Sequence, residues 1–170
     1  MEVSYLRNGF GFPKKILWYL MIFIVSHGVV TQPSLASGRP SESQATHLVD
    51  AFASPAVAQA LNHTYSIKLH VGNKPIKAMV ITIPSRVKVR NGVNVQNRSG
   101  ELIDSSYQIE DRQIKVNFEQ ALESEQIVRI SLQGVRSPRY SNTWMLPVSI
   151  RHQGIDFDIP VGTAYIRTFD

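Results

Sequence analysis

From residue 64 to the C-terminus, apolar and polar residues alternate in short runs, and this periodicity constrains the fold more than any other feature. In the first run, Thr64–Val71, residues Tyr65, Ile67 and Leu69 share one parity. Such alternation places the apolar side chains on one face of a half-buried strand. Similar runs follow, with turn residues between them. They predict further strands at residues 78–83, 106–109, 113–118, 127–132, 144–150, 155–161 and 163–169.

Three local signals refine this pattern. Asn91-Gly92 between two short apolar segments, Val87–Arg90 and Val93–Gln96, predicts a two-residue hairpin. Pro147 lies on the outward parity of its strand, which predicts an edge strand or a bulge because proline has no backbone N–H. Ser54 before Pro55 fits the start of one helical turn at Pro55–Ala60. Eight or nine short strands with at most one short helix predict an all-β, antiparallel β-sandwich of the immunoglobulin-like type.

The first 36 residues have the pattern of a secretory signal peptide. Basic residues precede an apolar run of ten, Ile16–Val25, and small residues lead to Ala36. Ten apolar residues are too few for a membrane-spanning helix, which needs about 20. We therefore predict cleavage after Ala36 and an extracytoplasmic location, in the periplasm, a lumen or the medium. An uncleaved membrane anchor at residues 16–30 is the alternative.

The remaining chain divides into a linker and one domain. Residues 37–46 read SGRPSESQAT and contain no apolar side chain larger than alanine. Such a segment cannot bury enough surface to become ordered, so a flexible linker is predicted. Residues 47–170 form the predicted sandwich domain.

Charge and cysteine content exclude several classes of function. The chain has a formal charge of +5, and without residues 1–36, which hold three basic residues and one acidic residue, the charge is +3. A mildly basic domain without a concentrated basic face does not predict nucleic-acid binding. The chain has no cysteine. This excludes disulfides, thiolate metal sites and a cysteine nucleophile.

No catalytic or cofactor motif is present. The histidines His47, His63, His70 and His152 do not have the spacing of metal ligands. His70 lies on the polar parity of its strand, which predicts a solvated side chain. The sequence contains no GxSxG, glycine-rich phosphate loop or SxxK motif. We therefore predict no enzymatic activity, no catalytic residue, no metal and no cofactor.

One pair of carboxylates keeps an enzymatic alternative open. Asp156 and Asp158 alternate with apolar residues in the predicted strand 155–161 and would share one face. Two carboxylates could bind a metal ion or divide acid and base roles, as in a small metal-dependent hydrolase. Calcium, however, needs 6–8 oxygen ligands. The main interpretation is therefore a solvent-facing strand surface, with Arg151 opposite the pair.

Cations also gather near the predicted hairpin and in one later loop. The loop 136–140 reads RSPRY, and its guanidinium groups could bind anionic groups. This makes Arg136, Arg139 and Tyr140 the candidate partner-binding residues, with a rigid structural connection as the alternative. The alternating cations at 86, 88 and 90 are interpreted as a charged edge that prevents sheet-to-sheet pairing, and as an acidic-polymer surface in the alternative.

The same loop carries a family resemblance. Residues 128–140 read VRISLQGVRSPRY, which resembles a segment typical of the family called domain of unknown function 2808, where a strand leads into an Arg-x-Pro-Arg-Tyr-like loop. Residues 144–150, 154–162 and 163–169 are similar to its later strands, and the whole resemblance covers about residues 47–170. It implies a short exported cyanobacterial protein and no activity, cofactor or catalytic residue. The resulting hypothesis is a non-enzymatic envelope module that binds a protein or glycan partner.

Overall fold

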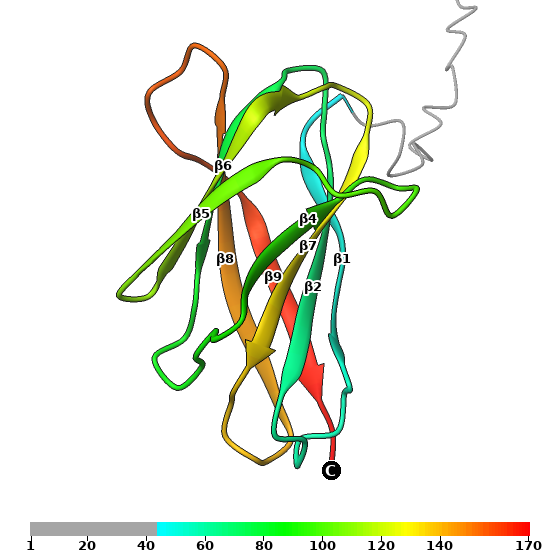
Figure 1. Ribbon diagram of the computed structural model, residues 1–170, viewed down its shortest axis with the longest axis vertical. Coiled ribbons are helices and arrows are strands. Elements are labelled where there is room, and N and C mark those ends of the chain that lie inside the picture. Colours follow the sequence, from blue (N-terminus) through cyan, green and yellow to red (C-terminus); the bar gives the residue numbers. More distant parts are fainter. Residues whose placement is uncertain (1–43) are drawn as a thin grey trace, which may run out of the picture. The chain divides into compact units, whose positions relative to one another are not determined.

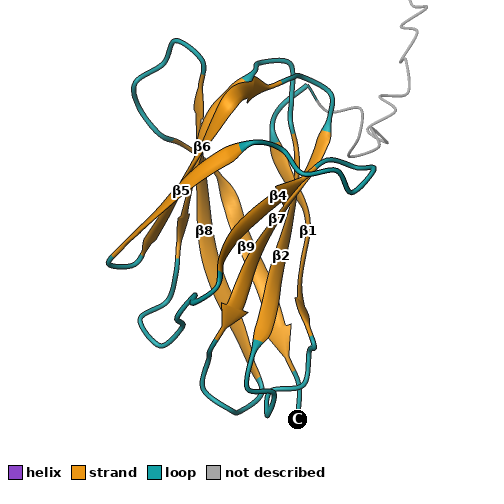
Figure 2. Cartoon of the chain, in the orientation of Figure 1, coloured by secondary structure: helices purple, strands orange, loops and turns teal. Residues whose placement is uncertain are grey.

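The computed structural model describes residues 44–170, which form nine strands and no helix (Figure 1). The colouring by secondary structure shows strands and loops only in this part of the chain (Figure 2). The predicted signal peptide and linker residues 37–43 lie outside it. The described residues contain no helix that could cross a membrane. The strands are β1 His47–Ser54, β2 His63–His70, β3 Ile76–Thr82, β4 Gly92–Gln96, β5 Ser105–Glu110, β6 Gln113–Leu122, β7 Ile127–Val135, β8 Asn142–His152 and β9 Ile159–Thr168.

The strands form two antiparallel sheets, with strand orders β1-β2-β7-β4 and β5-β6-β3-β8-β9. β6, β8 and β9 bury one parity, as the period-two pattern predicts, whereas the interior strands β2 and β3 bury residues of both parities and the edge strand β5 buries none. The two antiparallel sheets confirm the predicted all-β immunoglobulin-like sandwich. The largest fully buried side chains come from both sheets: Tyr65, Phe118, Ile67, Leu69, Ile76, Met79, Ile81, Ile114, Ile130, Leu132, Leu146 and Ile150.

The predicted hairpin at Asn91-Gly92 is wrong. β4 pairs with β7, with Val93 opposite Leu132, and residues 87–90 form no strand. Only Lys88 in that segment makes a β-bridge, with Arg136. Val93 and Val95 are buried in the core, and pairing with an interior strand buries them better than a two-residue hairpin could. Tertiary packing therefore overrides the local turn signal.

The strand β1 was not predicted, and the predicted helical turn at Pro55–Ala60 is absent. The pairing of β1 with β2 shifts register between Leu48 and Asp50. This bulge breaks the period of two that would reveal the strand. After β1, Val57 forms a parallel bridge with Phe169, and the Ala58 N–H donates to the Phe169 carbonyl at 2.6 Å. These contacts hold Val57 extended, and the chain then reverses in a single turn in which the Ala60 N–H donates to the Val57 carbonyl at 3.1 Å, so no helix forms.

The last two predicted strands are one strand, β9, which begins at Ile159. Residues 155–158 belong to the connection between β8 and β9. Pro147 lies in β8, an interior strand of its sheet, where it pairs with Thr163 of β9. The pairing of β3 with β8 ends at Val148, so Pro147 has only one paired neighbour. A bulge follows at Val148/Ser149, and both features suit a residue that cannot donate a ladder hydrogen bond.

The residues just before β1 are held against the end of β2. The Thr46 hydroxyl accepts a hydrogen bond from the Gly72 N–H at 3.0 Å, and the Gln44 carbonyl accepts one from Asn73 at 2.9 Å. A Cβ at Gly72 would lie 2.6 Å from the Thr46 nitrogen, so this close approach requires glycine. The domain boundary at residue 47 stays a prediction.

Candidate functional site

The RSPRY loop lies against the segment that was predicted as a charged edge. Lys88 and Arg136 exchange two backbone hydrogen bonds, of 2.9 and 2.8 Å. The Arg86 guanidinium donates to the Tyr140 hydroxyl at 3.3 Å, and the Tyr140 ring centroid is 6.1 Å from that of Trp144. Residues 86–90 therefore form a connection that fixes the loop, and β4 is the edge strand instead.

The three candidate partner-binding residues of this loop are all exposed. The side chains of Arg136 and Arg139 form no ion pair or hydrogen bond with the described residues. Tyr140 is held by Arg86 and packs near Trp144. Their role in partner binding stays a prediction.

Behind this loop lies a buried polar cluster of His63, Tyr65 and Ser137. His63 Nδ1 is 2.8 Å from the Pro55 carbonyl oxygen, and the His63 and Tyr65 rings are 6.0 Å apart. The Tyr65 hydroxyl, Ser137 Oγ and His63 Nε2 are buried without a hydrogen-bond partner. Burial raises the pKa of Tyr65, and the neighbouring Ser137 hydroxyl opposes this shift only partly. The cluster lies between the loop and β2, and these three polar atoms are not exposed to solvent.

His70 is buried, so the prediction of a solvated side chain is wrong. Its exposed fraction is 2%. The His47 ring lies 4.9 Å from the His70 ring, directly across the β1–β2 pair, and Glu125 Oε2 lies 4.0 Å from His70 Nε2. His70 Nδ1 and His47 Nε2 are buried without a partner. The alternation correctly places His70 on the outer face, but the neighbouring residues cover it there.

The carboxylates Asp156 and Asp158 do not share a strand face, because both lie before β9 begins. Asp158 accepts hydrogen bonds from Arg151 Nε at 3.0 Å and from Nη2 at 2.8 Å. The sequence correctly placed Arg151 opposite one of them. Among residues 44–170, no group of three His, Asp or Glu side chains is arranged to hold a metal ion.

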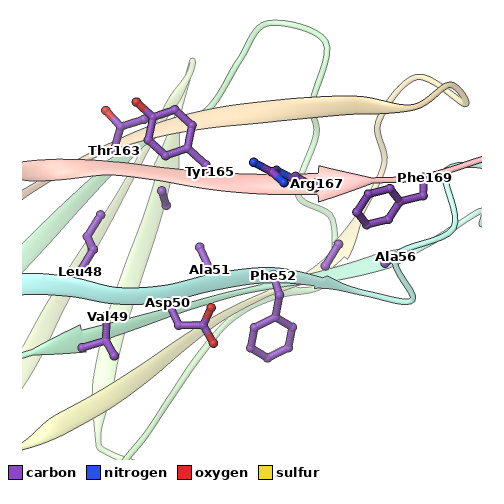
Figure 3. A pocket seen from close by; sticks show the side chains of 12 residues that line it. Leu48, Val49, Asp50, Ala51, Phe52, Ala56, Thr163, Tyr165, Arg167 and Phe169 are labelled. Carbon is purple, nitrogen blue, oxygen red and sulfur yellow. The ribbon is translucent and has the colours of Figure 1, made fainter. Parts of the chain in front are cut away.

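A hollow of about 450 Å³ lies where the edges of the two sheets meet at β1 and β9. Figure 3 shows β1 and β9 running side by side, with Leu48 and Ala51 directed between them and Asp50 and Phe52 directed away from β9. Alanines form much of the floor, because small side chains leave the space between the strands unfilled. The floor includes Ala51, Ala53, Ala56 and Ala164.

Exposed aromatic rings flank this groove. Phe52 stands on the β1 side, and Tyr165 and Phe169 stand on the β9 side. Polar groups are also present, since Asp50 and Arg167 line the same hollow. Aromatic side chains with a few charged neighbours are enriched at the centres of protein interfaces.

The two strand edges along the groove differ. The bulge in β1 interrupts its edge, a feature that opposes pairing with another chain. β9 is regular from Thr163 to Thr168, without proline or an acidic residue. Backbone hydrogen bonds join the two sides only beyond β1, between Phe169 and residues 56–58. The regular part of β9 therefore has an unpaired edge.

Sequence reasoning missed this groove entirely. It placed Tyr165 correctly in the last strand, extended that strand by one residue to Phe169, gave neither ring a role, and predicted no strand at Phe52. The groove depends on which strands become the sheet edges, and that pairing leaves no local pattern. An unbroken alternation without charge or proline in residues 163–166 was the only available signal.

Comparison with known protein families identifies the family to which this chain belongs. Residues 40–165 match the model of a protein family described as a protein of unknown function, DUF2808. The chain belongs to this family. No sequence among the curated proteins matches it. DUF2808 membership confirms the resemblance drawn from the RSPRY segment and assigns no chemistry to the groove.

Solved structures share the fold at low sequence identity. The N-terminal domain of the *Streptococcus gordonii* adhesin Sgo0707 has a TM-score of 0.51 at 14% identity, covering 74% of this chain and 32% of that one. The D312A variant of BcpA, the major pilin subunit of *Bacillus cereus*, has a TM-score of 0.50 at 9% identity, with coverages of 73% and 40%. An uncharacterised *Nocardia farcinica* protein with an immunoglobulin-like fold has a TM-score of 0.48 at 14% identity, with coverages of 75% and 100%. The chain spans well under half the length of the adhesin and pilin structures.

Proposed function

We propose that this DUF2808 protein is an exported, non-enzymatic module of the cell envelope that binds a protein partner in the groove between β1 and β9. The partner contributes an extended segment, which lies along the groove and uses the unpaired backbone groups of β9. The N-terminal signal pattern supports export, and the envelope location rests on that pattern and on the family resemblance.

The observation that carries this proposal is the open seam itself. A regular, unpaired strand edge stands beside a hollow with an alanine floor, and exposed aromatic rings flank it. An incoming strand would gain main-chain hydrogen bonds from β9 and side-chain contacts from the rings, as in other cases of strand addition. Proteins normally cover or charge such edges because they pair readily with other chains.

A protein segment fits this site better than a glycan. The free edge offers a row of backbone donors and acceptors, which a peptide can match along its whole length. A glycan could use the rings but not the regular backbone spacing. In this proposal the RSPRY loop, with Arg136, Arg139 and Tyr140, forms an outer contact with the same partner.

The test compares two tyrosines at opposite edges of the five-stranded sheet. Tyr165 is 57% exposed on β9 and Tyr107 is 45% exposed on β5. The protein is isolated from envelope fractions of the producing cell as wild type, Tyr165→Ala or Tyr107→Ala, and the co-purifying partner is identified and its affinity measured. We expect Tyr165→Ala to weaken binding at least about tenfold, the effect of losing a hot-spot side chain, and Tyr107→Ala to leave it unchanged.

Two results would reject the proposal. Equal binding by both variants would remove the groove from the interface. Recovery of the native protein from the cytoplasm would remove the envelope assignment, whatever the variants do. A parallel variant, Arg139→Gln, shows whether the RSPRY loop contributes to the same interaction.

A further inference from the structure

A second feature lies on the outer face of the four-stranded sheet, away from the β9 edge. Three cations, Lys68 of β2, Arg129 of β7 and Arg98 of the turn after β4, line one hollow of about 240 Å³. Lys68 and Arg129 are directly opposite each other in the β2–β7 register. Like charges in that position destabilise a sheet, so their pairing is not explained by the stability of the fold.

Of the acidic groups nearby, Asp50 pairs with Lys68 and Glu101 bonds to Asn97, while the exposed Glu125 lines the adjoining cavity. Asp50 Oδ2 lies 3.1 Å from Lys68 Nζ. The Glu101 carboxylate accepts a hydrogen bond of 2.7 Å from the Asn97 side-chain amide. The guanidinium groups of Arg98 and Arg129 have no ion-pair or hydrogen-bond partner within residues 44–170. Both therefore retain their full capacity to bind an anion in a bidentate manner.

The turn that carries Arg98 is held in place before any ligand arrives. Asn97 Oδ1 accepts hydrogen bonds from the backbone N–H groups of Ser99 and Glu101, at 2.9 and 3.0 Å. The Gly100 N–H donates to the Asn97 carbonyl at 3.1 Å, and Gly100 has a φ of 88°. This turn requires glycine at that position. Its fixed shape reduces the ordering cost of binding.

The hollow continues into a second one. A cavity of about 250 Å³ shares Asn97, Arg98 and Ile127 with the first and is also lined by His70 and Glu125. Only 2% of the His70 surface is exposed, and its Nδ1 atom has no hydrogen-bond partner. The two cavities adjoin at these three shared residues and are together called the cation groove; Lys68 and Arg129 line the first cavity and Ser99 and Glu125 line the second.

We propose that this groove binds an acidic polysaccharide, a chain whose sugars carry carboxylate groups. Arg98 and Arg129 bind the carboxylates, and Glu125 and Ser99 bind hydroxyl groups. An acidic peptide fits less well, because β2 and β7 are interior strands with both edges paired, and no backbone edge is free for strand addition. A single-stranded nucleic acid would need aromatic rings for stacking, and no aromatic ring other than histidine lines either cavity.

The test uses the protein purified in the form that the producing cell makes, titrated calorimetrically with tetragalacturonate and, as the neutral control, maltotetraose. We expect tetragalacturonate to bind and maltotetraose not to bind. Arg98→Gln and Arg129→Gln should each lower the affinity at least about fivefold. Arg167→Gln, which removes an unpaired cation at the β9 groove, is the matched control and should leave the affinity unchanged.

Several results would overturn this proposal. Failure of tetragalacturonate to bind at low ionic strength would overturn it. An equal loss in Arg167→Gln would show attraction to net charge without a site. A tetraglutamate peptide that binds as tightly as tetragalacturonate, and with the same dependence on Arg98 and Arg129, would assign the groove to an acidic peptide. None of these results bears on partner binding at β9, because Tyr165 and the cation groove are tested separately.

Discussion

The two seams of the sandwich, where an edge of one sheet meets an edge of the other, are built differently. At the β4–β5 seam the chain itself closes the gap. Ile103 donates a backbone hydrogen bond to Val95 of β4 at 2.9 Å, and the Asp104 carbonyl accepts one from Glu119 of β6 at 3.1 Å. Ile103 also packs against the core. At the β1–β9 seam the chain closes the gap at one end only, where residues 56–58 bond to Phe169, and an alanine-floored groove remains along the rest.

This difference shows that an open seam is not a requirement of the fold. The same sandwich covers one seam with the connection between β4 and β5 and leaves apolar surface exposed along the other. Exposed apolar surface beside a free strand edge promotes association with other chains. We therefore assign the partner-binding role to the open seam, and each prediction below tests whether the two seams really differ.

The largest expected effect on stability is at the closed seam. Ile103→Ala should lower the free energy of unfolding by about 1–3 kcal/mol, because it removes a partly buried side chain from the core. Tyr165→Ala at the open seam should change it by less than about 0.5 kcal/mol, as expected for an exposed side chain. Urea unfolding of both variants measures the difference. Equal losses would mean that the open seam is also a structural element.

Filling the groove should separate stability from binding. Ala51→Leu places a larger apolar side chain in the hollow between β1 and β9. We expect the free energy of unfolding to rise by about 0.5–1 kcal/mol, as in other cavity-filling substitutions, while partner binding is lost. The control is Ala121→Leu in β6, far from this groove. Retained binding by Ala51→Leu would place the partner elsewhere.

Tyr65 lies in the interior strand β2 and belongs to neither seam, so it provides a stability test that is independent of both. Its pKa is raised by burial above the ordinary value of 10.0, so the folded state holds the phenolic proton more tightly than the unfolded state does. Stability should therefore be unaffected by this group below pH 10 and should fall as the pH rises above it. In Tyr65→Phe that fall should be shallower, in unfolding experiments between pH 8 and 11. An identical pH profile in both proteins would contradict the assignment.

Much of the fold could be predicted from the sequence because burial on one sheet face imposes a period of two. The strands that carry Tyr65, Ile114 and Ile130 keep that period and were predicted within a few residues of their bounds. β1 was missed because its bulge breaks the period. The Asn91-Gly92 hairpin failed because β7 offers Val93 and Val95 a better burial than residues 87–90 can.

The candidate sites could not be predicted in the same way. The RSPRY loop is continuous in sequence, so it was visible as a motif, and much of it proves to be tied to Lys88 and Arg86. The two grooves, in contrast, bring together residues from distant strands. Lys68 and Arg129 are 61 positions apart and become neighbours only through the β2–β7 register. Strand order and register are set by the whole core, and no local pattern encodes them.

The most direct measurement of partner binding at the open seam is site-specific photo-cross-linking in the producing cell. A benzophenone amino acid is placed at position 165 on β9 or at position 107 on β5, the two edges of one sheet. We predict one discrete adduct from position 165, with the cross-link mapped to an extended segment of the partner, and none from position 107. The absence of an adduct at 165, or the same adduct from both positions, would contradict the assignment of binding to the open seam.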